Sequence, residues 1–102
     1  MTYFSGAKLF DLKATHGLPF DFSLARLIGE LGLSIDWPEF IETARKNGWW
    51  DFQSYEAICY AMADALIPRD EQEHIKNNLR SYIMSTLPTE TDDKWQLPQK
   101  AK

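Results

Sequence analysis

The sequence predicts an all-α fold, a compact bundle of about five helices. Two observations carry this prediction. Apolar residues recur every three or four positions in successive segments, which places them on one face of a helix. In addition, a glycine followed by an apolar residue, a common way for a helix to end, closes three of these segments. These pairs are Gly17-Leu18, Gly32-Leu33 and Gly48-Trp49.

The expected helices span residues 6–16, 24–31, 37–47, 52–66 and 69–86. No segment alternates apolar and polar residues between hairpin turns, so we expect no strands. The chain has 102 residues, of which 44% are hydrophobic, and this is the size of one domain. We assign residues 1–87 to a single helical domain. Residues 88–102, with two prolines and no sustained apolar period, are expected to form an extended or disordered tail.

The first two helices have recognisable ends. Ser5 is placed to cap the first helix, because its hydroxyl can accept a hydrogen bond from the first turn. Pro19, directly after the first glycine stop, prevents continuation of that helix. Ser23 is placed to cap the second helix. The apolar stripe of the second helix consists of Leu24, Leu27, Ile28 and Leu31.

Asp36 begins the third helix, with Pro38 in the first turn and Glu39 three residues on, an Asp variant of the capping box. Glu42 and Lys46 are spaced to form an i, i+4 ion pair on the side that faces solvent. The buried stripe consists of Trp37, Phe40, Ile41 and Ala44.

We expect the fourth helix to be the central, most buried element. It begins near Asp51, and its wide apolar face includes Cys59 and extends to Leu66. A second row, formed by Ala57, Ala61 and Ala65, would let a neighbouring helix approach closely. Pro68 leads into the fifth helix, whose first turns carry acidic residues, as the helix dipole favours.

The net charge of −4 argues against the basic surface that most non-specific nucleic-acid binders need. The one cysteine excludes an intramolecular disulfide. The first residues lack the pattern of a signal peptide, and no apolar run approaches the roughly 18–20 residues that cross a bilayer. We therefore expect a cytoplasmic protein without a membrane partner.

No catalytic motif is present, and we expect neither an enzyme nor a cofactor. The sequence lacks a phosphate-binding glycine loop, a nucleophile elbow and the zinc-protease helix motif. His16, His74 and Cys59 are the strongest candidate metal ligands, but their spacing does not place them on one helical face. A zinc site needs three or four ligands, so no metal is expected. His16 suits the free carbonyls at the end of the first helix, and Cys59 suits a core.

Aromatic residues at the joint between the third and fourth helices are the candidate partner-binding site. Trp49 follows a glycine stop and is expected to fold back on the third helix, while Phe52 is expected to enter the core. Trp50 is left for the surface, where exposed aromatic side chains anchor protein partners or stack on unpaired bases. Trp95 in the tail is a further candidate contact.

Part of the chain resembles alanyl-tRNA synthetase. The similar segments are Lys8-Leu9-Phe10-Asp11, then Thr15-His16-Gly17-Leu18-Pro19-Phe20-Asp21-Phe22-Ser23, then Gly32-Leu33-Ser34-Ile35-Asp36. Over roughly residues 7–45 they resemble the helical region that follows the catalytic domain of that family. The family's motifs for ATP and alanine and its editing domain are absent, so the resemblance does not imply aminoacylation.

The resemblance does imply where an RNA contact would be sought, because the helical region of that family lies near the tRNA acceptor stem. Asp21 and Ser23 match residues of the family's motif, and Lys8 and Lys13 belong to the first helix. These four residues are the candidate RNA contacts.

Three functions fit the sequence. The first is a non-catalytic protein-interaction module, of the kind that phages and mobile elements encode to bind a host factor. The second is an RNA-binding fragment related to the synthetase region, which the acidic net charge places behind the first. The third is a structural domain that associates with itself through its alanine row. The sequence leaves the identity of the partner and the oligomeric state open.

Overall fold

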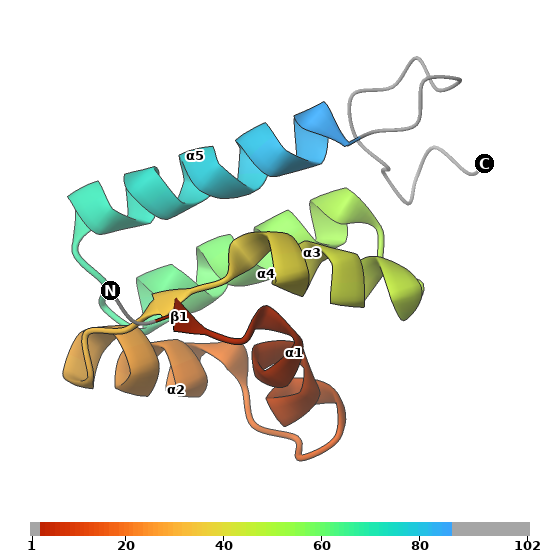
Figure 1. Ribbon diagram of the computed structural model, residues 1–102. Coiled ribbons are helices and arrows are strands. Elements are labelled where there is room, and N and C mark those ends of the chain that lie inside the picture. The colour runs from red at the N-terminus through yellow and green to blue at the C-terminus, as the bar shows by residue number, and fades with distance from the viewer. Residues whose placement is uncertain (1–2, 87–102) are drawn as a thin grey trace.

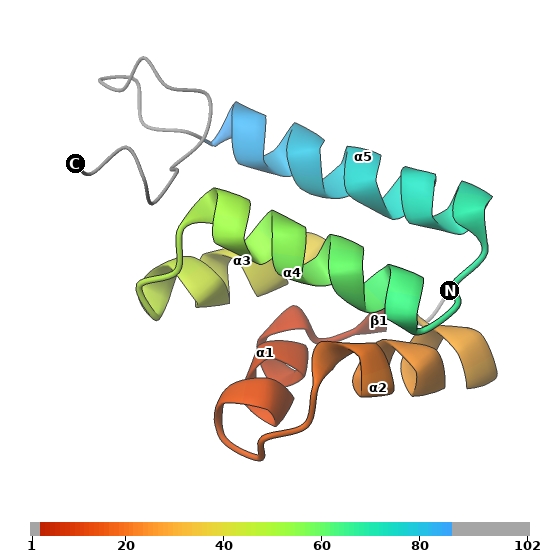
Figure 2. The ribbon, with the colours of Figure 1, turned by 180° about the vertical axis from the view of Figure 1, so that it is seen from behind.

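The computed structural model describes residues 3–86, and over them it has the predicted helical fold. The helices are α1 (Gly6–Ala14), α2 (Phe20–Leu24), the π-helical segment η1 (Ala25–Glu30), α3 (Trp37–Lys46), α4 (Asp51–Asp64) and α5 (Arg69–Ser85). Two short strands are β1 (Tyr3–Phe4) and β2 (Ser34–Ile35). Figure 1 shows three layers, in which α5 covers α3 and α4, and these cover α1 and α2. The view from behind in Figure 2 shows the same order.

The two strands correct the expectation that the chain has none. Tyr3 pairs with Ser34 and Phe4 pairs with Ile35 in a parallel ladder of two residues per strand. Asp36 N then donates to Phe4 O at 3.0 Å. Strands this short leave no room for the alternation of apolar and polar residues by which a strand is recognised in a sequence. The ladder brings the residues before α1 to the start of α3.

The crossing of α1 and α3 depends on Gly6. A Cβ atom at this position would lie 2.2 Å from Asp36 O and 2.3 Å from Phe40 N. Both neighbours are backbone atoms, so neither can rotate away as the end of a side chain could. The missing side chain therefore lets the first turn of α1 lie directly on the first turn of α3.

The helix caps lie at the same crossing. Ser5 Oγ accepts from Lys8 N at 3.1 Å and Asp36 Oδ1 accepts from Glu39 N at 3.1 Å, as predicted. Glu39, however, does not complete a capping box in its own helix. Its Oε1 accepts from Ser5 Oγ at 2.8 Å and from Gly6 N at 2.9 Å. These bonds, the Ser5 bond foremost, lower the pKa of Glu39. One carboxylate thus ties α1 to α3.

An aromatic cluster fills the core where α1, α2 and α3 meet. Phe40 is fully buried at its centre. Its ring centroid lies 6.1, 5.5 and 5.7 Å from those of Phe10, Phe20 and Trp37. Trp49 joins from the loop after α3, at 5.1 Å from Phe10 and 6.2 Å from Phe20. Tilted and edge-to-face ring pairs at such distances contribute about 0.5–1.5 kcal/mol beyond their burial.

The three predicted glycine stops are confirmed. Gly17, Gly32 and Gly48 have φ values of 71°, 67° and 83°, in the left-handed region that ends helices. At Gly48 the two bonds of a Schellman closure are present, each 3.0 Å long, from Gly48 N to Arg45 O and from Trp49 N to Ala44 O.

A fourth closure of this kind uses a leucine. Leu66 N donates to Ala63 O at 3.2 Å and Ile67 N donates to Met62 O at 3.1 Å, while Leu66 has a φ of 60°. A side chain in the left-handed region costs roughly 1–2 kcal/mol. The sequence-based expectation was wrong here, because α4 ends at Asp64 and Leu66 is 86% exposed instead of lying on the apolar face.

The second helix differs most from the prediction. It begins at Phe20 and not at residue 24, so Ser23 is buried inside α2 and does not cap its start. In η1 the helix widens, and Leu31 N donates to Arg26 O, five residues earlier. A π turn holds more residues than an α turn, so the side chains that follow it are rotated. Leu31, the last member of the predicted stripe, is therefore exposed.

The last element, α5, ends at Ser85, next to the predicted end at residue 86. The predicted tail, residues 88–102, and the candidate Trp95 lie outside the described residues. The expectations for them stay predictions.

Gly6→Ala is expected to lower the free energy of unfolding by about 3 kcal/mol, because its methyl group would overpack a backbone contact. Urea unfolding followed by circular dichroism measures the change. Gly29→Ala is the matched control, because no atom beyond its chain neighbours and the backbone of its own helix lies within 4 Å of the Cβ position of Gly29 in η1. There alanine is expected to stabilise by up to about 1 kcal/mol. Equal destabilisation by both substitutions would contradict the role given to Gly6.

Glu39→Gln is expected to weaken the dependence of stability on acidic pH. The folded state lowers the pKa of Glu39 below its ordinary value of 4.5. Its carboxylate therefore stabilises the folded state above that value, and the contribution is lost as the pH falls through the lowered pKa. Urea unfolding at pH values on both sides of 4.5 tests this, with Glu30→Gln on an exposed side chain as the control. The idea fails if the acid branch of Glu39→Gln matches that of the unsubstituted chain.

Candidate functional site

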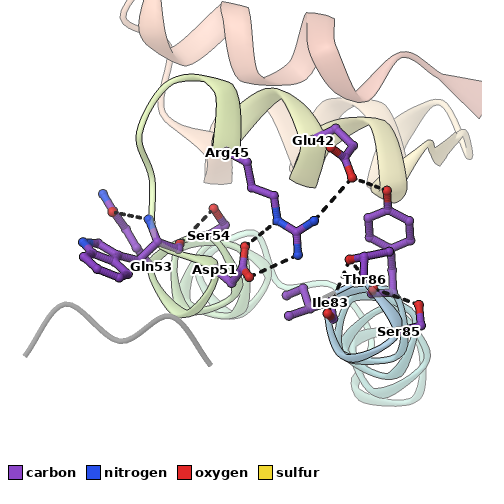
Figure 3. A network of polar contacts seen from close by, with 10 residues as sticks. Glu42, Arg45, Asp51, Gln53, Ser54, Ile83, Ser85 and Thr86 are labelled. Carbon is purple, nitrogen blue, oxygen red and sulfur yellow. Dashed lines mark hydrogen bonds and ion pairs between the residues drawn. The ribbon is translucent and has the colours of Figure 1, made fainter. Parts of the chain in front are cut away.

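Arg45 and Asp51 form the most buried ion pair among residues 3–86. Asp51, the first residue of α4, is 2% exposed. Its Oδ1 accepts from Arg45 Nε at 2.8 Å and its Oδ2 accepts from Arg45 Nη2 at 3.1 Å (Figure 3). Two parallel charge-assisted bonds fix both side chains, and the Asp51 carboxylate raises the pKa of Arg45. The pair therefore orders the joint between α3 and α4.

Glu42 extends this network to α5. Arg45 Nη1 donates to Glu42 Oε2 at 3.3 Å, and the Tyr82 hydroxyl donates to the same oxygen. The bond to Glu42 raises the pKa of Tyr82. Glu42 therefore pairs with Arg45 and Tyr82 in place of the predicted partner Lys46. Three helices meet at one set of polar side chains.

The end of α5 is closed by hydroxyl groups in place of a glycine. Ser85 Oγ donates to Tyr82 O at 3.0 Å, and Thr86 Oγ1 donates to Tyr82 O at 2.8 Å and to Ile83 O at 3.4 Å (Figure 3). These bonds satisfy carbonyl groups that the last helical turn leaves free.

One residue of the predicted aromatic site at the α3–α4 joint, Trp49, is taken up by packing. Trp49 belongs to the aromatic cluster of the core. Trp50 is only partly exposed, contrary to expectation, and its backbone begins α4: its N donates to Gln53 Oε1 at 3.3 Å, and its O accepts from Ser54 N at 3.0 Å. Phe52 is half-buried in the first turn of α4. Phe52 belongs neither to the core cluster nor to the residues packed against it, so the expectation that it enters the core was wrong. Of the three residues, Trp49 is the one that folding explains.

The residues predicted to contact RNA differ in exposure and surroundings. Ser23 is buried, and Asp21 is half-buried in the first turn of α2. Lys13 Nζ lies 5.7 Å from the centroid of the Phe20 ring. Lys8, in contrast, lines a groove between α1 and α3. Ser23 is therefore not accessible for an RNA contact, and Lys8 and Lys13 have different surroundings.

The candidate metal ligands are also separate. Among the residues that the structure describes, no group of three or more His, Cys, Asp or Glu side chains could hold a metal ion. His16 is exposed, with its Nε2 3.7 Å from the Asp11 carboxylate. Cys59 is half-buried, and this burial raises the pKa of its thiol. A raised pKa disfavours the reactive thiolate.

The predicted alanine row lies inside the protein. Ala61 is buried, and Ala57 and Ala65 pack partly buried against the core. The row therefore serves packing within this chain.

Several large apolar residues are more exposed than Trp49 and Trp50, and they are better candidates for contact with a partner. Within residues 3–86 they are Tyr3, Phe22, Leu31, Tyr60, Leu66 and Met84. Two of these, Phe22 and Tyr3, line grooves.

The α1–α2 groove is small and apolar, with a volume of about 250 Å³. Its lining residues are Phe4, Leu12, Leu18, Phe22, Ser23, Arg26 and Leu27. Arg26 is the one charged residue among them, and the Phe22 ring is 58% exposed. In Figure 1, α1 and α2 form the layer opposite to α5.

The α5 groove lies between α5 and the corner where β2 leads into α3, and its volume is about 550 Å³. Its lining residues are Tyr3, Ile35, Asp36, Trp37, Pro38, Asn78, Ser81, Tyr82 and Ser85. Four of them, Tyr3, Ile35, Trp37 and Asn78, also line a smaller hollow of about 170 Å³. Glu71 and His74 line this hollow as well, so it extends the groove towards the start of α5.

Sequence reasoning missed both grooves and the buried ion pair. One signal for the pair was present, since Arg45 and Asp51 lie on either side of the glycine turn at Gly48. Phe22 was missed because the start of the second helix was placed after it. In a helix that begins at Phe20, Phe22 and Arg26 are four residues apart and share one face.

Comparisons with models of protein families, with curated proteins and with solved structures find no match for this chain. The resemblance to alanyl-tRNA synthetase therefore stays a prediction. In the described part of the chain, no helix has both the length and the apolar character that crossing a bilayer requires.

Arg45→Met is expected to lower the free energy of unfolding by about 3 kcal/mol, because it leaves the Asp51 carboxylate buried without its partner. Arg26→Met is the matched control. Its guanidinium is exposed, lies 3.3 Å from Glu30 and is expected to contribute less than about 0.5 kcal/mol. Urea unfolding of both variants measures the difference. Similar losses in the two variants would contradict the structural role of the Arg45–Asp51 pair.

Proposed function

We propose that this chain is a non-catalytic protein-interaction module whose partner binds the α1–α2 groove. One observation supports the proposal above others: Phe22 is 58% exposed at a groove lined mainly by apolar side chains. Exposed apolar surface at a concave site is typical of places where proteins bind one another. An aromatic side chain in such a position is a common energetic centre of an interface.

The chemistry of the groove suggests the chemistry of its partner. Leu12, Leu18 and Leu27 offer an apolar floor for an aliphatic or aromatic side chain. Arg26, the one charged residue among the described residues of the groove, forms an exposed pair with Glu30 at 3.3 Å. A carboxylate from a partner can take the place of Glu30 at little cost. The proposed partner is therefore a protein segment with a large apolar residue next to an acidic one.

This proposal moves the anchor from Trp50 to Phe22. Trp50 is only partly exposed and its backbone begins α4, whereas Phe22 lies in α2 and is exposed. An anchor that contributes binding energy must exchange contact with water for contact with the partner. Phe22 has more surface to exchange.

The other two functions have less support. Binding of RNA would need its phosphate contacts on one surface, but Lys8 and Lys13 lie in different surroundings and Ser23 is buried. Self-association through the alanine row would need Ala57, Ala61 and Ala65 at the surface, but they pack on the core.

Selection from a displayed random peptide library tests the proposal. Peptides with a large apolar residue beside an acidic one are expected to be enriched. Phe22→Ala is expected to weaken their binding by about 30-fold in Kd, which corresponds to about 2 kcal/mol. Arg26→Ala is expected to weaken it by up to about fivefold, the range of an exposed charge pair.

Tyr60→Ala is the matched control, because the Tyr60 ring on α4 is 66% exposed and lies outside the α1–α2 groove. Its effect on Kd is expected to be small. Absence of any enriched peptide, or equal binding of the peptides to the Phe22→Ala and Tyr60→Ala chains, would overturn the proposal.

A further inference from the structure

We propose that the α5 groove is the docking site of a segment of the same chain, residues 94–97, with Trp95 as its anchor. This contact is separate from the proposed partner site, because the two grooves share none of their described lining residues. Its occupant would cover the α5 side of the molecule and leave the α1–α2 layer free.

The shape of the α5 groove suits an aromatic side chain followed by an extended segment. Trp37 is buried beneath it, while Tyr3 is 62% exposed at its wall. A volume of about 550 Å³ is in the range of sites that bind small ligands, and it is large enough for one tryptophan side chain and part of its neighbours. Asn78, Ser81 and Ser85 add amide and hydroxyl groups that can hydrogen-bond a peptide backbone.

The position of the groove puts residues 94–97 within reach. Ser85, the last residue of α5, lines the groove, so the chain leaves its last helix at one end of it. Trp95 follows Thr86 by nine residues, which span up to about 30 Å when extended. Asn78 precedes Ser85 by seven residues, or about 10 Å along a helix. Trp95 can therefore reach any point between Ser85 and Asn78, and the remaining length lets the chain reverse its direction after α5.

The α5 groove and the residues on either side of Trp95 carry opposite charges. No lysine or arginine is among the described residues that line the α5 groove or the hollow that continues it, whereas Asp36 and Glu71 are. Lys94 precedes Trp95 directly, and Lys100 and Lys102 follow on the other side. The acidic residues after α5 come earlier in the chain, before Lys94. Docking of Trp95 and Leu97 would thus bring lysines towards carboxylates.

A nitroxide label tests this contact in the full chain. We would introduce Gln99→Cys in a Cys59→Ala background, attach the label, and record amide spectra by NMR. The expected result is that the backbone amides of Asn78, Ser81 and Ser85 lose most of their intensity and regain it when the label is reduced. The same labelled chain with Trp95→Ala and Leu97→Ala is the control, in which these amides are expected to keep their intensity.

Two further variants test the charge argument. Glu71→Lys, in the hollow that continues the groove, is expected to restore part of the lost intensity by repelling Lys94 and Lys100. Glu73→Lys is the matched control, because Glu73 lies on the same helix outside both lining sets, exposed beside Lys76. It is expected to leave the loss unchanged.

The possible results of these experiments distinguish tail docking at the α5 groove from partner binding at the α1–α2 groove. Equal amide intensities with and without the Trp95 and Leu97 substitutions would overturn tail docking. So would a loss that appears in a mixture of unlabelled isotope-enriched chains and labelled unenriched chains, because the segment would then belong to a second copy. Phe22→Ala is expected to leave the intensity loss unchanged. Failure of peptide binding at the α1–α2 groove and failure of tail docking are therefore distinguishable.

Discussion

The backbone contact between α1 and α3 at Gly6 is the constraint on which the rest of this fold depends. Around it lie the strand ladder, the two helix caps and the Glu39 carboxylate that joins Ser5 and Gly6. All act within about one helical turn of the crossing. They hold α1 against α3, so that Phe10 of α1 lies on Phe40, and Phe20 at the start of α2 packs on the same ring. The polar network of Arg45 then sets α4 and α5 against the far end of α3.

Features of the fold that depend on neighbouring residues were predictable. Each glycine stop, the Ser5 cap and the Asp36 cap involve groups within about one turn of the chain, so a short stretch of sequence contains the whole interaction. Glu39 shows the limit of prediction from neighbouring residues. Its spacing from Asp36 suits a capping box, yet it bonds residues more than thirty positions away. The same limit concealed the close approach at Gly6, which looks in the sequence like any glycine near a helix start.

The candidate site was harder to predict, because exposure is decided by packing. The aromatic run at the α3–α4 joint was expected to reach the surface at Trp50, but the same glycine closure that ends α3 places Trp49 in the core and makes Trp50 the start of α4. Phe22, in contrast, resembles a core residue in its sequence context, and it is exposed because α2 begins earlier than its apolar stripe suggests. Composition gives the number of aromatic residues and not which of them reach the surface.

The π-helical segment η1 has a consequence for the length of the chain. A π turn resembles an α turn into which one residue has been inserted. Loss of one residue between 25 and 30 would convert the segment to α-helix and leave Leu31 facing as it does now, because the π turn accommodates its extra residue without changing the register of the turns on either side. The flanking ends of the helix would keep their own hydrogen bonds. Homologous chains that differ in length by one residue can therefore share this fold, and their alignment gap belongs inside a helix and not in a loop.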